Sequence, residues 1–226
     1  MPDNNRCDNF REECRFCSLP EPWRVILRTP RFRVLVGLGP PVVGYCVLIT
    51  EKHVDCYAAL QSSQTDEFLF VVRAIQTAQR RVFGASLLFE HGRNGGCLPY
   101  GHDDDLCYHA HLHVLPAALD LVQAVQADYG IENVDDWDAL RAVTDGGAIP
   151  YLLVQNGLQL ACVIDPQKLP GRYLRTKIAQ ILNLDPAYAD WQAFPRYDMV
   201  RQGVAALRDT LSQTWYSLTA ANEDAC

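Results

Sequence analysis

Residues 109–115 read HAHLHVL, in which histidines alternate strictly with apolar residues. Successive side chains of a β-strand point to opposite faces, so His109, His111 and His113 would share one face and the apolar residues the other. Neighbouring rings would lie about 7 Å apart at a rise of about 3.4 Å per residue. This spacing favours one substrate held between the rings over one metal bound by adjacent rings. A strand with a histidine-rich solvent face is the alternative interpretation.

Segments on both sides of this run carry strand or helix signals. Apolar residues at helical spacing predict a helix over 63–83, with Ser63 and Asp66 as its capping pair and Gly84 as its end. The pair Asn156-Gly157 predicts a tight hairpin. The other expected strands cover 23–29, 31–38, 42–50, 85–92, 151–155 and 158–164, and the other expected helices cover 117–129, 173–182 and 198–212.

This order of elements predicts an α+β fold. We expect an antiparallel sheet of about five strands, with the long helix packed on it and the histidine run on one strand. No histidine follows residue 113, so the chemistry is concentrated in the first half of the chain. We therefore expect a catalytic core over 1–118 and, over 119–226, a C-terminal extension of a hairpin and helices that packs on or covers the cleft.

The bulk composition excludes several classes of protein. The formal net charge is −7, whereas general binders of nucleic acid or of anionic membranes need a cationic surface. The start of the chain carries acidic residues and has no apolar core, unlike a signal peptide. The most apolar stretch, 34–49, is broken by Pro40 and Pro41 and is too short to span a bilayer. We therefore expect a soluble cytoplasmic protein whose partners include neither a nucleic-acid polymer nor a membrane.

Two of the nine cysteines, Cys14 and Cys17, form a C-x-x-C motif. The odd count and the length of the chain argue against a disulfide scaffold, and nothing suggests the parallel strand that accompanies a redox pair. A tetrahedral zinc site needs two further ligands, and all six histidines lie between positions 53 and 113. With His53 and His109 the site would be closed and structural, and the other two histidines of the run would keep other roles. Two unrelated thiols are the alternative.

The run HAHLHVLP matches the H-φ-H-φ-H-φ-φ signature of the histidine triad (HIT) superfamily, where φ is apolar, and the chain resembles zinc-containing members of that family. Supporting matches run in order along the chain. CRFC resembles their C-x-F-C, and GPPVVGYCVLITEKHV resembles their strand that ends in K-x-H, with TEKH in place of the usual P-K-x-H. LLFEHG, PYLLVQNG and LPGRYLRTKIAQILNL resemble a longer bacterial branch. The resemblance covers most of the chain.

The resemblance implies a HIT-like fold and nucleotide chemistry. His111 would attack the α-phosphorus of a nucleotide and form a nucleotidyl-histidine that water or an acceptor resolves, a task that suits a neutral imidazole. His113 would contact the phosphate oxygens or the leaving group. The resemblance assigns structural zinc to Cys14, Cys17, His53 and His109. It implies a hydrolase or nucleotidyltransferase with a nucleotide-type small molecule as substrate, and family members often pair as homodimers.

The loop before the histidine run departs from the family pattern. Most members have Gly, Gln or Ser there, whereas this chain has Asp103, Asp104 and Asp105, which would oppose an anionic substrate unless they face solvent. His91 and His102 flank this loop and are interpreted as exposed loop residues.

Candidate phosphate ligands therefore come from elsewhere: Arg175, Arg172 and Asn94. Arginine suits this role because its paired donors match phosphate geometry, although both arginines could instead be solvated helix charges. Two other functions stay open. One is a biosynthetic or ligand-binding protein that uses the HIT scaffold for a non-dinucleotide substrate. The other is a metal-dependent enzyme with catalytic zinc, which an open metal position would favour.

Overall fold

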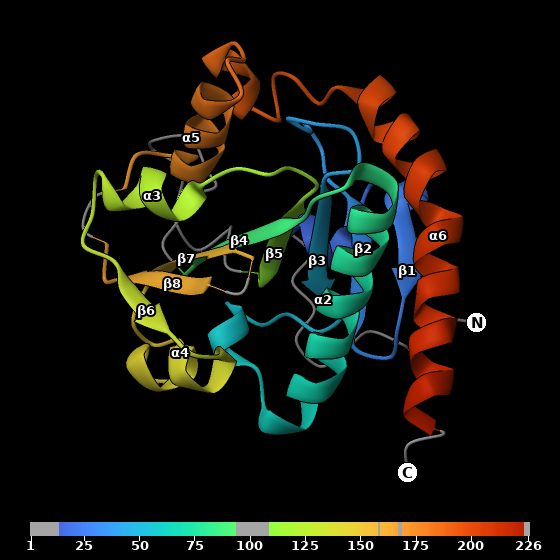
Figure 1. Cartoon of the computed structure of the whole chain (residues 1–226), viewed down its shortest axis with the longest axis horizontal. Coiled ribbons are helices and arrows are strands. Elements are labelled where there is room, and N and C mark those ends of the chain that lie inside the picture. The colour runs from blue at the N-terminus through green and yellow to red at the C-terminus, as the bar shows by residue number, and fades with distance from the viewer. Residues whose placement is uncertain (1–13, 94–108, 158, 167–168, 224–226) are drawn as a thin grey trace.

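The computed structural model describes residues 14–93, 109–157, 159–166 and 169–223. In this part of the chain, one open antiparallel sheet has the strand order β1-β2-β3-β5-β4-β7-β8-β6 (Figure 1). The strands are β1 (Val25–Arg28), β2 (Phe32–Val36), β3 (Cys46–Thr50), β4 (Leu87–Gly92), β5 (His111–Leu115), β6 (Glu132–Val134), β7 (Tyr151–Asn156) and β8 (Gln159–Ile164). The mixed α+β class and the antiparallel pairing are confirmed. The expected five-strand sheet is wrong, because the sheet has eight strands.

The three additional strands come from the C-terminal extension. β7 pairs with β4 on the side away from β5, with Phe89 opposite Val154 and His91 opposite Leu152. β8 and then β6 follow at the edge. The predicted hairpin is confirmed, and Gly157 in its turn has a φ of +58°, which glycine adopts without strain. The extension therefore continues the sheet of the first half, and the boundary expected at 118/119 stays a prediction.

Six α-helices accompany the sheet in the described residues: α1 (Arg15–Ser18), α2 (Ser62–Phe83), α3 (Leu121–Gln126), α4 (Trp137–Val143), α5 (Tyr173–Ile181) and α6 (Tyr197–Glu223). Short 3-10 turns cover Pro22–Arg24, Tyr57–Ala59 and Pro186–Ala189. The long helix expected over 63–83 is α2, but its capping box joins Gln61 to Gln64 and not Ser63 to Asp66. The expected helix over 198–212 is longer than predicted, because α6 continues to Glu223.

Hydrophobic cores lie on both faces of the sheet. One core fills the space under α2 and α6, and the other lies under α3 and α5. Val47 and Ile49 belong to the second core, and their cross-strand partners on β5 are His113 and His111. Cross-strand partners share a face of the sheet. The two histidines therefore point to the face that α3 and α5 cover.

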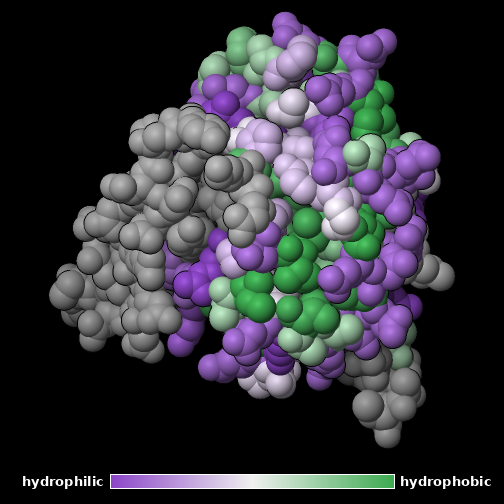
Figure 2. Space-filling model, turned by 90° about the vertical axis from the view of Figure 1, so that its left-hand side faces the viewer, coloured by the Kyte–Doolittle hydropathy of each residue, from purple (hydrophilic) through white to green (hydrophobic). Residues whose placement is uncertain are grey.

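On the side that lies to the left in Figure 1, some apolar side chains of the described residues reach the surface. Figure 2 shows hydrophobic residues gathered in the middle of this side, with hydrophilic residues around them. Partly exposed apolar side chains such as Val143 on α4 and Ile181 on α5 are ordinary features of protein surfaces. In the described part of the chain, no helix combines the length and the apolar character needed to cross a membrane.

Candidate metal centre and histidine site

Two cysteines and two histidines meet at one point, and their four ligand atoms lie within 4.8 Å of one another: Cys14, Cys17, His53 and His109. Cys14 Sγ lies 3.3 Å from Nδ1 of His109, and Cys17 Sγ lies 3.4 Å from Nδ1 of His53. Bonds of about 2.3 Å to sulfur and 2.0 Å to nitrogen around a tetrahedral ion place such atoms about 3.5 Å apart. The group predicted from the sequence therefore comes together and could hold a metal ion.

Local structure places each of these ligands. Cys14 precedes α1, and its carbonyl oxygen accepts the backbone N–H groups of Cys17 at 3.1 Å and Ser18 at 3.0 Å. This tight turn brings the two sulfur atoms to the same side. His53 follows β3, and His109 precedes β5, which is the neighbour of β3 in the sheet. The centre therefore ties the N-terminal turn to the middle of the sheet.

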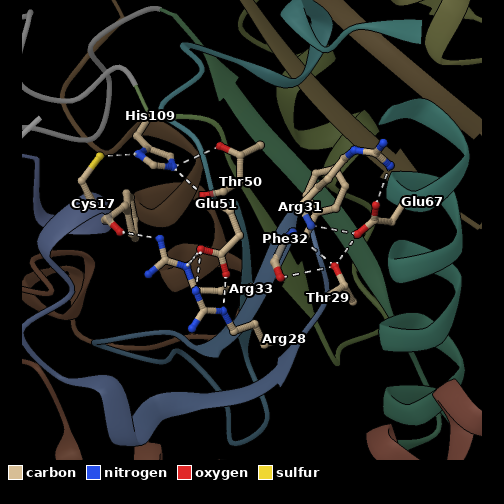
Figure 3. A network of polar contacts seen from close by, with 11 residues as sticks. Cys17, Arg28, Thr29, Arg31, Phe32, Arg33, Thr50, Glu51, Glu67 and His109 are labelled. Atoms are coloured by element: carbon tan, nitrogen blue, oxygen red, sulfur yellow. Dashed lines mark hydrogen bonds and ion pairs between the residues drawn. The ribbon is translucent and has the colours of Figure 1, made fainter. Parts of the chain in front are cut away.

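Polar contacts behind the centre orient His109 and the turn (Figure 3). His109 donates from Nε2 to the carbonyl oxygen of Thr50 at 3.0 Å, which directs Nδ1 towards the sulfur atoms. Arg33 donates from Nη2 to the carbonyl oxygen of Phe16 at 3.1 Å, and its Nε pairs with Glu51 at 3.3 Å. Partners of this kind fix the ring orientation of metal ligands and the position of the turn that carries them.

Burial shifts the pKa values of two of the four ligands. Desolvation lowers the pKa of His109 to about 3, so the ring is neutral and offers a lone pair. Desolvation also raises the pKa of the Cys14 thiol to about 11, although the backbone N–H of Cys17 acts in the other direction. A buried thiolate at this position needs a cation, which a bound metal would supply. The chemistry of the donor set therefore fits a metal.

His111 lies on β5 and is 6% exposed. Its Nδ1 donates to the backbone carbonyl oxygen of His109 at 2.6 Å. Because Nδ1 carries the proton, the lone pair of the neutral ring lies on Nε2. Phe16, from the turn between the two cysteines, packs against this ring with centroids 5.1 Å apart. A neutral imidazole held in one tautomer can act as a nucleophile or as a base.

His113 lies next to His111 on the same face, with ring centroids 5.0 Å apart and planes at 83°. It stacks on Phe89 with centroids 4.5 Å apart, and its Nδ1 is hydrogen-bonded to the Tyr45 hydroxyl. Desolvation, helped by the nearby charge of Arg175, holds the pKa of His113 well below its usual range, so this ring is neutral. Among the described residues, Nε2 of His113 is buried without a hydrogen-bond partner.

His91 differs from the sequence analysis, which predicts an exposed loop residue. It lies within β4 and is 6% exposed. Its ring lies 6.4 Å from that of His113, and its Nε2 accepts the backbone N–H of Leu174 at 3.5 Å. Desolvation lowers the pKa of His91 to about 3. The strand expected over 85–92 places His91 on the face of Phe89, and this alternation is the signal that could have found it.

Glu90, which the sequence analysis did not single out, points to the opposite face of β4 and is 1% exposed. Its Oε1 accepts the backbone N–H of Tyr57 at 2.9 Å, and its Oε2 accepts the Tyr151 hydroxyl at 2.6 Å. Desolvation raises the pKa of Glu90 to about 7, although both hydrogen bonds act in the other direction. This carboxyl group therefore titrates near neutral pH inside the core.

Arg175 reaches the histidine site from α5. It donates from Nη1 to the Tyr45 hydroxyl at 3.2 Å, from Nη2 to the carbonyl oxygen of Gly39 at 2.5 Å and from Nε to that of Ala189 at 3.0 Å. These contacts use all three nitrogen atoms of the guanidinium. Its predicted contact with phosphate stays a prediction.

The other predicted phosphate ligands do not meet the histidines in the described residues. Arg172 pairs with Asp190 at 3.0 Å, at the start of α5. Asn94, His102 and the three aspartates at 103–105 lie outside the described residues. Phosphate contacts by Arg172 and Asn94 therefore also stay predictions.

Compared with known proteins, the sequence matches no family model and no curated protein sequence. Membership of the HIT family therefore stays a prediction from the sequence motifs.

Proposed function

We propose that the protein is a nucleotide hydrolase or nucleotidyltransferase of the HIT type, in which His111 attacks the α-phosphorus of a nucleotide-type small molecule. The observation that carries the proposal is the 2.6 Å hydrogen bond from His111 Nδ1 to the carbonyl oxygen of His109. It places the lone pair on Nε2, the ring nitrogen farther from the backbone, and keeps it ready for attack.

The reaction consists of two displacements at phosphorus. In the first, the lone pair of His111 Nε2 forms a bond to the α-phosphorus, and the bond to the leaving group breaks. The leaving group departs with that electron pair and takes a proton from solvent. In the second, the oxygen of water or of an acceptor hydroxyl bonds to phosphorus and loses its proton to solvent. The electrons of the nitrogen–phosphorus bond then return to Nε2.

His113 is suited to bind the phosphoryl oxygens in both steps. Its ring lies 5.0 Å from that of His111 on the same strand. A neutral ring that donates a hydrogen bond from a fixed position stabilises negative charge that develops on oxygen. The net charge of −7 agrees with a small nucleotide and not a nucleic-acid polymer as the substrate.

We infer that the ion held by Cys14, Cys17, His53 and His109 is zinc in a structural role. Two thiolates and two imidazoles form a donor set typical of zinc. Four protein ligands complete a tetrahedral shell and leave no position for a water molecule, which disfavours the catalytic-zinc alternative. Bound zinc would hold His109 in place, and the carbonyl group of this residue in turn orients His111.

Turnover of a substrate panel tests the proposal. The panel contains adenosine and guanosine polyphosphates, phosphoramidates and acyl-adenylates, and each is incubated with wild type and with His111→Asn. We expect wild type to turn over at least one class of substrate in the panel. The turnover rate of His111→Asn with that substrate should be lower by more than about a thousandfold. Thermal unfolding of the variant controls for its folding.

Two other results would count against the proposal. The absence of both turnover and nucleotide-dependent thermal shifts across the panel would contradict it. Thermal shifts without turnover would favour the ligand-binding alternative, in which the chain uses the same face to hold a nucleotide.

A further inference from the structure

Tyr45 connects Arg175 of the C-terminal extension to His113 of the histidine run. Arg175 Nη1 donates to the Tyr45 hydroxyl oxygen at 3.2 Å, and the guanidinium carbon lies 5.6 Å from the centroid of the Tyr45 ring. The same hydroxyl group is hydrogen-bonded to Nδ1 of His113. Tyr45 is 1% exposed and His113 is 6% exposed. Two consecutive hydrogen bonds therefore link Arg175, Tyr45 and His113.

The charge of Arg175 sets the direction of both hydrogen bonds. A guanidinium group only donates, so the Tyr45 oxygen is the acceptor of the first bond. A phenol that accepts a hydrogen bond from a cation becomes a stronger donor, because the bonds of a chain polarise one another. The better acceptor beside it is the imine nitrogen of a neutral imidazole. His113 therefore accepts at Nδ1 and carries its own proton on Nε2.

The Arg175 and His113 side chains of this hydrogen-bonded series are held in place independently of any substrate. The Arg175 guanidinium is held by the carbonyl oxygens of Gly39 at 2.5 Å and Ala189 at 3.0 Å. The His113 ring is held by Phe89, which stacks on it with an interplanar angle of 18°. The position of the His113 Nε2–H group is therefore set before binding, which is the arrangement that preorganised sites require.

The Nε2 atom of His113 lacks a hydrogen-bond partner in the described part of the chain, although it is buried. Buried polar atoms are nearly always paired, and an unpaired one in a native structure is often explained by a catalytic role or by a bound water or ion. Nδ1 and Nε2 lie on different sides of the ring, so this N–H points away from Tyr45. With His111 on the same face and 5.0 Å away between centroids, an oxygen acceptor here would belong to the group that reacts at His111.

We propose that Tyr45 and Arg175 are positioning residues that hold His113 as an Nε2–H donor to an anionic oxygen of the phosphoryl group reacting at His111. The identity of the acceptor rests on the proposed function, whereas the tautomer is a property of the resting protein. In this arrangement Arg175 acts through Tyr45 and His113, in place of the direct phosphate contact that the sequence predicts. The C-terminal extension thereby fixes the position of a proton in the core of the first half.

Nuclear magnetic resonance of the full chain with isotope-labelled histidine tests the tautomer directly. Long-range proton–nitrogen correlations show which ring nitrogen carries the proton, and His113→Gln assigns the signals. We expect His113 to be protonated on Nε2 in wild type. Tyr45→Phe removes the donor to Nδ1, and Arg175→Met removes the cation that directs this donor. Both variants should give a mixture of tautomers and lower kcat by roughly tenfold to a hundredfold, with a smaller change in KM.

Two matched variants control for the loss of a buried hydroxyl and of a guanidinium. Tyr173→Phe removes a hydroxyl bond to Asp128 at 2.7 Å, and Arg196→Met removes a bond to the carbonyl oxygen of Pro40 at 2.9 Å. The hydrogen bonds that these two variants remove, to Asp128 and to Pro40, do not involve the histidines. Both controls should keep the wild-type tautomer and the wild-type kcat.

A His113 proton on Nδ1 in wild type would overturn the inference, whatever the activity of the protein. If Tyr45→Phe and Arg175→Met both fold and His113 keeps its wild-type tautomer in both, the positioning role of Tyr45 and Arg175 is overturned. If the tautomer responds as expected but no nucleotide is turned over, the phosphoryl acceptor is overturned together with the proposed function. The positioning role of Tyr45 and Arg175 is then supported independently.

Discussion

The carbonyl oxygen of His109 accepts a hydrogen bond from His111 Nδ1 at 2.6 Å, while Nδ1 of the His109 ring lies 3.3 Å from Cys14 Sγ. One residue therefore serves the metal centre through its side chain and the proposed nucleophile through its backbone. An ion that holds the His109 ring also holds the carbonyl group that selects the tautomer of His111. Under the proposed function, a bound metal would act on the reaction through this backbone contact, as a support and not as a reactant.

Loss of one ligand should empty the metal centre. Cys14→Ala leaves three ligands, so we expect the metal content to fall from about one ion per chain to near zero. The free energy of unfolding should fall by more than about 3 kcal/mol, because metal binding stabilises the folded state only. Elemental analysis and urea denaturation measure the two effects. Cys162→Ala, which removes a buried thiol elsewhere, should keep its metal; equal metal content in the two variants would refute the assignment.

Arg33 should support metal affinity through the N-terminal turn. Arg33→Met removes the 3.1 Å bond to the carbonyl oxygen of Phe16, so we expect zinc affinity to fall about tenfold to a hundredfold in a chelator competition. Arg28 is the matched control, because it pairs with the same Glu51 at 2.7 Å but its side chain is 70% exposed. Arg28→Met should change the affinity less than about threefold. An equal loss in both variants would mean that the ion pairs with Glu51, and not the contact with the turn, support the centre.

Glu90 should make the protein less stable as the pH rises through neutrality. Burial raises its pKa to about 7, whereas the pKa of a glutamate in the unfolded chain is about 4.3. Between these values the folded state binds the additional proton, so the stabilising contribution is present at low pH and is lost as the pH rises through about 7. Glu90→Gln lacks this titration. The free energy of unfolding of wild type minus that of the variant should fall by up to about 1.4 kcal/mol per pH unit in this range.

Urea denaturation of both proteins at about pH 5 and about pH 8 measures this difference. The buried histidines act in the opposite sense, because their lowered pKa values make their contribution disappear as the pH falls: His91, His109 and His113. They are present in both proteins, so their effect cancels in the comparison. A difference that does not change with pH would show that Glu90 stays in one charge state.

The Cys14 and Cys17 pair of the candidate metal centre could be predicted from the sequence because local geometry places it, whereas His53 and His109 approach it only through the pairing of β3 with β5. A C-x-x-C turn brings its two sulfur atoms together, and a strand directs alternate side chains to one face. The same alternation applied to 85–92 would have placed His91 correctly. For α2, periodicity indicated the body of the helix and its end at Gly84, and only the first residue and the N-terminal capping pair differed.

Contacts between distant segments could not be predicted in this way. The hairpin of β7 and β8 was expected, but its pairing with β4 depends on which sheet edge is accessible after folding. The bond between Arg175 and Tyr45 joins residues 130 positions apart and exists only because α5 docks on the histidine face. β6 has three residues, which is too short for a recognisable alternation.

The most direct test of the central claim is to trap a nucleotide on His111. Wild type is mixed with a substrate from the panel, quenched in base, where a phosphoramidate persists, and analysed by intact-mass and peptide mass spectrometry. We predict an additional mass of one nucleotidyl group on the peptide that contains His111, and no such adduct on His111→Asn. Turnover by wild type with the adduct on another residue, or an adduct that persists in His111→Asn, would contradict the proposal.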